Sequence, residues 1–360
     1  MTTPARPQGT TPEQLRRVAT PPPAARERGW RGVLGALFAL AILPTLPQLR
    51  LLTPVDQILL IIAPAMAACA IAAWWRGGRL SFALLWLVLA AWIVSGPTRS
   101  DGSFAQLERA WCVSLAGMFG VTHVVMPRHR FLPRALAALA GTTMLLIVIL
   151  LLSGDFQELH AIVTGEIDRR LAASVDMVSE AMRSTQWQRL AQSSPMFARF
   201  AADSAQQLQQ FASVGKNVYV AVLAIESLAG LALTWALFHR VSRTRIGAPL
   251  TALREFRFSD QLVWGLVASI VLVILPTLSA VRGVGFNLLI FFGALYALRG
   301  FGVLAWYFAS HRVGFVIVMI VAILALPLTS LFSLGVGLGD TWLDWRGRPR
   351  PASRPPSRDS

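Results

Sequence analysis

The sequence predicts an all-α, polytopic membrane protein with about nine (eight to nine) membrane helices and an extracytoplasmic helical hairpin inserted between them. The first observation is composition: 55% of the 360 residues are hydrophobic and 14% are charged, against about 25% charged in an average soluble domain. The second is placement, because the charges border apolar stretches of about 18 or more residues, the length that crosses about 30 Å of hydrocarbon.

The basic excess and the two cysteines exclude other classes of protein. The net charge is +15, but the arginines stand in tails and short loops between apolar stretches, where membrane insertion places them. Nucleic acid is therefore not an expected partner, whereas the lipid bilayer is. Cys69 and Cys112 both lie in apolar stretches, so neither a disulfide framework nor a metal site is expected, and no cofactor is implied.

The N-terminal part of the chain begins with a polar arm. Residues 1–30 are rich in Pro, Arg, Thr and Ala without apolar periodicity, which predicts a disordered cytoplasmic arm. Pro44 and Pro47 weaken the first apolar segment that follows, because neighbours must satisfy the carbonyls that proline frees. The N-terminal membrane helices are expected within residues 31–153, at about 32–50, 55–75, 80–97, 106–126 and 133–153.

Residues 154–213 predict a pair of amphipathic helices outside the cytoplasm. After Ser194-Pro195, a cap followed by proline at the first helical position, the second helix is expected to run into the next membrane helix. Two interpretations are open: the apolar stripes of the two helices bury each other, or they form a lid or a partner-docking surface. The first stripe recurs at spacings of three and four and consists of Phe156, Leu159, Val163, Ile167, Leu171, Val175, Val178 and Met182.

Residues 214–346 predict the C-terminal membrane helices, and 347–360 a disordered Arg/Pro-rich tail. Arginines at alternate boundaries place the N-terminus in the cytoplasm. The protein is expected in a bacterial inner membrane. Nine crossings would leave the arginine-rich tail outside. Either the rule fails at this end, or the last segment does not cross fully because Pro327 breaks it. The four segments lie at about 214–238, 261–281, 286–309 and 313–336.

The stretch "GLGD" contains the GxGD signature of intramembrane aspartyl proteases. Such an enzyme needs two carboxylates in one site, but no second aspartate lies within the nine segments, and Asp340 itself follows the last apolar stretch. We therefore expect no catalytic residue and no enzyme, with the protease as the weakest alternative.

We expect instead an interface motif at this end of the chain. In it, glycines end the last helix and Asp340 caps a short surface helix, sharing a face with Asp344. Tryptophans suit the headgroup layer, and one of the two aspartates pairs with Arg346. The residues of the motif are Gly337, Gly339, Asp340, Trp342, Asp344, Trp345 and Arg346.

Two ionisable residues lie near the middle of predicted membrane helices, Glu226 and Arg299. Such residues are costly in a membrane and are functional candidates. Their depths differ by roughly 3 Å at about 1.5 Å per residue, so they are expected either to pair or to form a polar ligand site. Residue type and depth name four further candidates for a small-molecule site: Asn287, Tyr296, Asn217 and Tyr219.

Four stretches carry a resemblance to a known family: "GALFALAILPTLPQL", "ALFHRVSR" with "LREFRFSDQLVW", "NLLIFFGALYALRGFGVLAWYF" and "GLGDTWLDWR". From about residue 32 to 346 the chain resembles the YybS-like bacterial membrane proteins of unknown function. Its architecture is also similar to the substrate-binding subunits of energy-coupling-factor transporters. That similarity implies that small residues of the first helix, here Gly35 and Ala39, meet another membrane subunit. Gly300 and Gly302 are expected to allow close helix packing.

These observations lead to two functional hypotheses of different classes. The first is a non-enzymatic membrane protein that binds or transports a small solute of unknown identity, with other membrane subunits as partners. The second is a scaffold or assembly protein that docks partners through its outer hairpin and anionic lipid through its basic loops.

Overall fold

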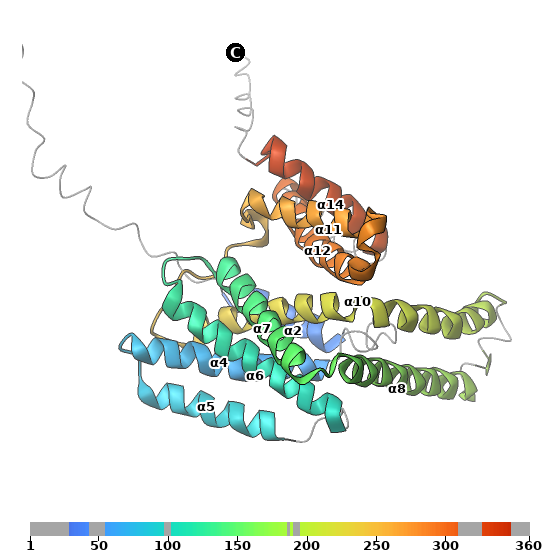
Figure 1. The fold of residues 1–360 in the computed structure, drawn as a ribbon, viewed down its shortest axis with the longest axis horizontal. Coiled ribbons are helices and arrows are strands. Elements are labelled where there is room, and N and C mark those ends of the chain that lie inside the picture. Colours follow the sequence, from blue (N-terminus) through green and yellow to red (C-terminus); the bar gives the residue numbers. More distant parts are fainter. Residues whose placement is uncertain are drawn as a thin grey trace, which may run out of the picture.

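The computed structural model describes residues 29–42, 55–96, 102–185, 188–189, 195–308 and 326–346 (Figure 1). Every regular element in these residues is a helix, so the predicted all-α class is confirmed. The α-helices are α2 (Arg31–Ile42), α4 (Val55–Trp75), α5 (Leu80–Ser95), α6 (Gly102–Val125), α7 (Phe131–Ser153), α8 (Phe156–Arg183), α10 (Pro195–Val241), α11 (Val263–Ile274), α12 (Arg282–Tyr307) and α14 (Leu326–Leu343). The 3₁₀ turns are η2 (Leu253–Glu255), η3 (Asp260–Leu262) and η4 (Pro276–Val281).

Four helical stretches in the described part of the chain are long and apolar enough to cross a membrane, which makes the protein polytopic. They are Ile58–Trp75, Phe131–Ser153, Ala212–Val241 and Pro276–Tyr307. Two further apolar helices, Leu80–Ser95 and Asp260–Ile274, are shorter. The expected total of about nine crossings stays a prediction.

Two of the expected segments differ from the helices that form. The segment expected at 261–281 contains only the 12-residue helix α11, about 18 Å long, because Pro276 cannot continue it and starts η4 instead. The segment expected at 313–336 is described only from residue 326. There Pro327 is the second residue of α14, where proline costs little, so within the described residues it lies at the start of a helix. Residues 43–54, with Pro44 and Pro47, lie outside the described residues.

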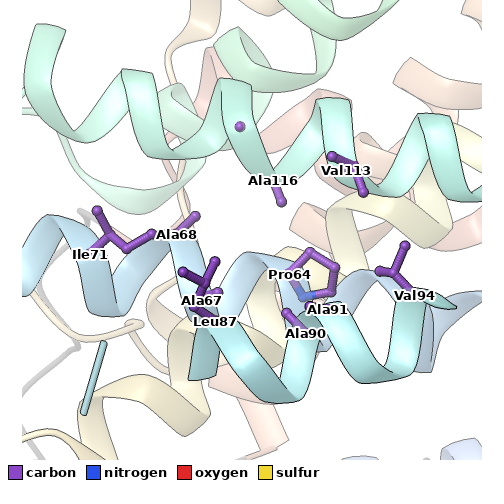
Figure 2. A pocket seen from close by; sticks show the side chains of 11 residues that line it. Pro64, Ala67, Ala68, Ile71, Leu87, Ala90, Ala91, Val94, Val113 and Ala116 are labelled. Atoms are coloured by element: carbon purple, nitrogen blue, oxygen red, sulfur yellow. The ribbon is translucent and has the colours of Figure 1, made fainter. Parts of the chain in front are cut away.

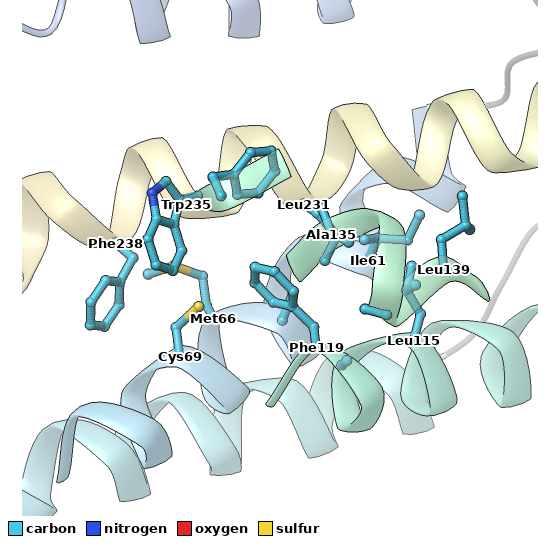
Figure 3. Close-up of a cluster of buried hydrophobic side chains, with 14 of the residues drawn as sticks. Ile61, Met66, Cys69, Leu115, Phe119, Ala135, Leu139, Leu231, Trp235 and Phe238 are labelled. Atoms are coloured by element: carbon cyan, nitrogen blue, oxygen red, sulfur yellow. The ribbon is translucent and has the colours of Figure 1, made fainter. Parts of the chain in front are cut away.

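The core lies where α10 crosses α4, α6 and α7 (Figure 3). Trp235 and Phe238 of α10 and Phe119 of α6 are fully buried there, and the rings of Trp235 and Phe119 lie 6.1 Å apart, edge to face. Gly230 lets α10 approach α4, because a Cβ at that position would lie 2.9 Å from Ile61. Between membrane helices, close packing of this kind supplies the association that water exclusion supplies in soluble proteins.

Two arginines join the helix ends at one side of this core. Arg134 of α7 is fully buried and donates hydrogen bonds to the carbonyls of Met126 (2.9 Å) and Pro127 (2.6 Å). Arg76, after α4, donates to the carbonyls of Ile246 (2.8 Å) and His123 (3.0 Å). Loop carbonyls thus satisfy these charges, which explains part of the basic excess without an external anion.

The hairpin consists of α8 and the first part of α10, which lie side by side (Figure 1). Ile167 of α8 and Ala212 of α10 are buried between them, with Val163, Leu171 and Val175 packed around. The middle of the predicted stripe therefore faces the partner helix, as the first of the two interpretations requires. Phe156, at the start of the stripe, is exposed instead.

The C-terminal helices form a second group, above α10 in Figure 1. There α12 packs against α11 and α14 and also contacts α10. Among the described residues, the buried Asp and Glu side chains lie in two regions: the junction of α6, α8 and α10, and the contact of α12 with α14.

Candidate functional site

Glu226 lies on α10 within the stretch long and apolar enough to span a membrane. Only 4% of the residue is exposed. Neither of its carboxylate oxygens has a hydrogen-bond partner among the described residues. Since an ionised carboxylate that lacks hydrogen bonds is very costly in such surroundings, helix packing alone does not explain this residue.

Charged groups from two other helices act on the Glu226 carboxyl group. They are Glu108 of α6 and Arg170 of α8. Glu108 is itself buried, with 4% of the residue exposed. We call the group formed by Glu108, Arg170 and Glu226 the junction site, because it joins the hairpin to the membrane helices.

Aromatic and hydroxyl groups close the junction site on several sides. Phe104 of α6 lies beneath the guanidinium of Arg170, whose Cζ is 5.0 Å from the ring centroid. The Phe104 ring lies 6.3 Å from that of Tyr219 on α10. Trp111 Nε1 of α6 donates a hydrogen bond of 3.0 Å to Ser227 Oγ, on the residue after Glu226. These contacts join α6 to α8 and to α10 around the junction site.

Arg170 is only partly satisfied in this arrangement. Its Nε donates to Glu166 Oε1 at 2.7 Å, whereas its buried Nη1 has no hydrogen-bond partner among the described residues. Burial alone would raise the pKa of Glu166, but the hydrogen bonds and charges of Arg169 and Arg170 outweigh it and hold that pKa below its ordinary value. Glu166 therefore anchors Arg170 on α8 and leaves one of its donors directed elsewhere.

The predicted ion pair between Glu226 and Arg299 is wrong. Arg299 of α12 binds two aspartates instead: its Nε donates to Asp340 Oδ2 at 3.0 Å and its Nη1 to Asp260 Oδ1 at 2.7 Å. Its Nη2 also donates to the Asp340 carbonyl at 3.3 Å. The depths of Glu226 and Arg299 matched, but α12 presents Arg299 to α14 and not to α10.

A second arginine completes this group. Arg346 Nη2 donates to Asp340 Oδ2 at 2.6 Å, and its Nη1 reaches the carbonyls of Arg254 and Phe256 at 3.2 and 3.0 Å. The predicted contact of Asp340 with Arg346 is therefore present. We call Asp260, Arg299, Asp340 and Arg346 the C-terminal clamp. These residues join α12, α14 and the loop that connects α10 to α11.

The predicted surface helix after the glycines does not form. Helix α14 continues without a break to Leu343, so Gly337 and Gly339 lie inside it and Asp340 is not a cap. Asp340 is buried, with 1% exposed, whereas Asp344 follows the helix with a φ of 39° and binds Arg257 at 2.8 Å. The two aspartates therefore face different surroundings, contrary to the expectation of one shared face.

Glycines bring α12 and α14 into backbone contact. A Cβ at Gly300 would strike the Ser333 carbonyl, and a Cβ at Gly337 would strike the Tyr296 carbonyl. Gly302 faces the Leu253 carbonyl and Gly339 the ring of Trp345, where added Cβ atoms would lie 2.5 and 2.7 Å away. Gly300 thus has the helix-packing role that the sequence predicts, and Gly337 shares it, whereas Gly302 packs against the turn η2 and Gly339 against Trp345.

The side chain of Asn287 on α12 binds the backbone of α10 beside Asn217, and the small-molecule site expected at these residues stays a prediction. Asn287 Oδ1 accepts a hydrogen bond of 2.8 Å from the backbone N–H of Ala221, and its Nδ2 donates to the Asn217 carbonyl at 2.8 Å. In a regular α-helix, the backbone N–H of Ala221 would donate to the carbonyl of Asn217, four residues earlier. The Asn287 carboxamide is therefore inserted beside the α10 hydrogen-bond ladder, where α10 passes from the hairpin into the membrane part.

The remaining candidates lie apart from one another. Tyr219 packs against the hairpin stripe, whereas Tyr296 is fully buried beside Phe258 near the C-terminal clamp, with ring centroids 5.1 Å apart. A Cβ at Gly35 would meet no described atom within 4 Å, and the side chain of Ala39 lies outside the described residues. Trp342 is 70% exposed, which suits the predicted headgroup position.

An apolar groove of about 310 Å³ runs between α4, α5 and α6 (Figure 2). Pro64, Ala67 and Ala68 of α4 line it opposite Ala90 of α5, and every other lining residue is also apolar. A specific ligand site needs some polar groups to fix orientation, so this groove suits hydrocarbon rather than a polar solute.

Sequence reasoning missed three of the residues that matter. Glu108 lies in the expected segment 106–126, so its charge at membrane depth was a usable signal. Asp260 precedes an expected membrane segment and Arg170 belongs to the hairpin, so neither is a charge within an expected membrane helix. The described residues contain no group of three or more His, Cys, Asp or Glu side chains that could hold a metal ion.

A family model described as "Predicted membrane protein (DUF2232)" matches residues 126–341, well over half of the chain. The matched region contains α7, the hairpin, Glu226 and the C-terminal helices as far as Asp340. No curated protein matches the chain, and no solved structure does.

Proposed function

Because the chain belongs to this family of predicted membrane proteins (DUF2232), we propose that it is a non-enzymatic membrane subunit that binds a small polar solute for transport. One observation carries the proposal: Glu226 is buried in a potential membrane helix with both oxygens unpartnered among the described residues. Membrane proteins keep such a group where it has a task, since a neutral side chain would pack at lower cost.

The charges around Glu226 indicate what kind of solute would fit. Glu226 and Glu108 attract a donor or a positive charge, while the unpartnered Nη1 of Arg170 attracts an acceptor. A small solute with both a donor and an acceptor meets these demands. The C-terminal clamp offers no such opportunity, because the carboxylate of Asp340 already accepts from two arginines.

The proposal includes an orientation and a partner. The arginines near the ends of α4, α7 and α10 favour a bacterial inner membrane with the N-terminus in the cytoplasm and the hairpin outside. The likeness to energy-coupling-factor subunits favours a second membrane subunit as partner. It would meet α2 at Gly35, beside the exposed side chains of Leu34 and Phe38.

The docking hypothesis has less support from the hairpin. A docking surface would use the apolar stripe of α8, but its central residue Ile167 is buried against α10. A partner would therefore have to bind the polar face of α8. Loss of copurifying envelope proteins on deletion of 156–212 is the result that would favour this alternative.

Native mass spectrometry of the full chain, released gently from its own membranes, tests the proposal. The wild type is expected to carry a small molecule that Glu226→Gln loses and that the exposed control Glu180→Gln keeps. Absence of any bound small molecule from the wild type, or its full retention by Glu226→Gln, would contradict a solute site at Glu226.

A further inference from the structure

We propose that the junction site binds a proton at Glu226, and that Arg170 takes the place of this proton when it leaves. The inference rests on the site of the proposed function and names a ligand and a coupling that solute binding alone does not require. It begins from two of the buried groups that lack hydrogen-bond partners among the described residues, namely the carboxyl of Glu226 and Nη1 of Arg170.

The surroundings of Glu226 favour its neutral form in this arrangement. The charge of Glu108 on α6 opposes a second negative charge nearby, and burial in a membrane helix opposes it further. A protonated carboxyl group carries no net charge and can remain buried at lower cost. A proton needs one carboxyl group and no cavity, whereas hard metal cations take six or more oxygen ligands.

The ionised form would need a positive partner, and Arg170 is the arginine whose charge acts on Glu226. Arg109 of α6, next to Glu108, donates to the Gly96 carbonyl at 2.7 Å. The other helices packed against α10 contribute little charge there. Between Ile58 and Trp75, α4 carries none; α7 carries only Arg134, bound to loop carbonyls. On α12, Arg299 is held by the C-terminal clamp and Arg282 is the first residue of the helix, while Arg31 likewise begins α2.

Arg170 lies on α8 in the hairpin, so a movement of its side chain would also displace a helix outside the membrane part. It is anchored through Glu166, which lies on the same helix, four residues earlier. When Glu226 loses its proton, Arg170 is drawn towards α10 and α8 moves with it. Proton binding and the position of the hairpin are therefore coupled.

Infrared difference spectroscopy on the full-length protein in vesicles of phosphatidylcholine and phosphatidylglycerol tests this. Steps of pH are expected to reveal a carboxylic-acid C=O band at neutral pH that Glu226→Gln removes and Glu180→Gln keeps. Labelling the wild type with ¹³C-glutamate must shift the band, which identifies a glutamate even if Glu226→Gln fails to fold. A neutral-pH spectrum without such a band would overturn the proposal.

The role of Arg170 has its own readout. Arg170→Gln keeps Glu226 but removes the partner of its ionised form, so the midpoint of the band's loss should rise by about one pH unit or more. The protection of α8 amides, measured relative to their intrinsic exchange rate at each pH, should change with pH in the wild type and not in Arg170→Gln. An unchanged midpoint would refute the exchange with Arg170.

The two proposals can fail separately. If the band is present and no solute is retained in native mass spectrometry, the proton site stands and the solute site fails. If a solute is retained in a Glu226-dependent way and the band is absent, the solute site stands and proton binding is refuted.

Discussion

The junction site and the C-terminal clamp both bury charges between helices, but they differ in how these charges are matched. In the clamp, the Asp340 carboxylate accepts from Arg299 and Arg346. At the junction site, the Glu226 carboxyl accepts from no described group. A buried charge that is fully paired holds elements together, whereas one left unpaired is costly unless something else occupies the site. We therefore propose a structural task for the clamp and a binding task for the junction site.

The largest expected effect is at the centre of the clamp. Asp340→Ala leaves Arg299 and Arg346 without their shared carboxylate, and removing one partner of a buried ion pair costs about 3–5 kcal/mol. We expect a strongly lowered midpoint of thermal denaturation in detergent. Size-exclusion chromatography measures the fraction of protein that remains folded at each temperature. Asp344→Ala is the matched control, since its pair with Arg257 is exposed and worth about 1 kcal/mol or less. Equal effects of the two substitutions would show that the clamp contributes no more to stability than an exposed ion pair.

The next largest effect is expected where α12 contacts α14, the two helices that hold Arg299 and Asp340 together. Gly300→Ala and Gly337→Ala each drive a Cβ into a backbone carbonyl of the neighbouring helix, and we expect a cost of about 2–3 kcal/mol for each. The same substitution at Gly335 or Gly293 meets no described atom and should leave the denaturation midpoint unchanged. Tolerance of alanine at both Gly300 and Gly337 would show that α12 and α14 are not in backbone contact.

A smaller effect is expected where α12 supports α10. Asn287→Ala removes two hydrogen bonds to the α10 backbone, so it should cost about 1–2 kcal/mol. Asn217→Ala removes only an exposed bond to the carbonyl of Ser213 and should be close to neutral. The same denaturation assay measures both, and a larger loss for Asn217→Ala would contradict the arrangement.

The smallest effect separates the two partners of Arg299. The Asp260 side chain is 62% exposed and that of Asp340 is fully buried, so solvent screens the first contact more than the second. Asp260→Asn should therefore cost about 1 kcal/mol or less. If it destabilises the protein as much as Asp340→Ala does, burial does not determine how strongly a contact contributes to the clamp.

The sequence was sufficient for the fold class, because hydrocarbon admits only helices or closed barrels and the apolar stretches have helix length. It was also sufficient for the close helix packing at Gly300, since small residues mark such contacts. It misled at 261–281, where apolar composition continues past Pro276 although the helix does not.

The site was only partly predictable, for a physical reason. Residue counting gives the depth of a side chain but not the helix that it faces. Glu226 and Arg299 match in depth, yet Arg299 meets Asp340, 41 residues further along the chain, because glycines bring α14 against α12. Arg170 could not be foreseen at all, since nothing in the sequence specifies where the hairpin lies against α6.

One pair of isosteric substitutions tests the comparison most directly. Glu226→Gln and Asp340→Asn each replace a buried carboxyl group by a carboxamide of the same shape, and thermal denaturation in the same detergent measures both. We predict a midpoint within about 2 °C of the wild type, or above it, for Glu226→Gln, because its carboxyl group has no hydrogen-bond partner among the described residues to lose, and a large decrease for Asp340→Asn. A large decrease for Glu226→Gln together with a wild-type midpoint for Asp340→Asn would reverse the assignment of the two regions.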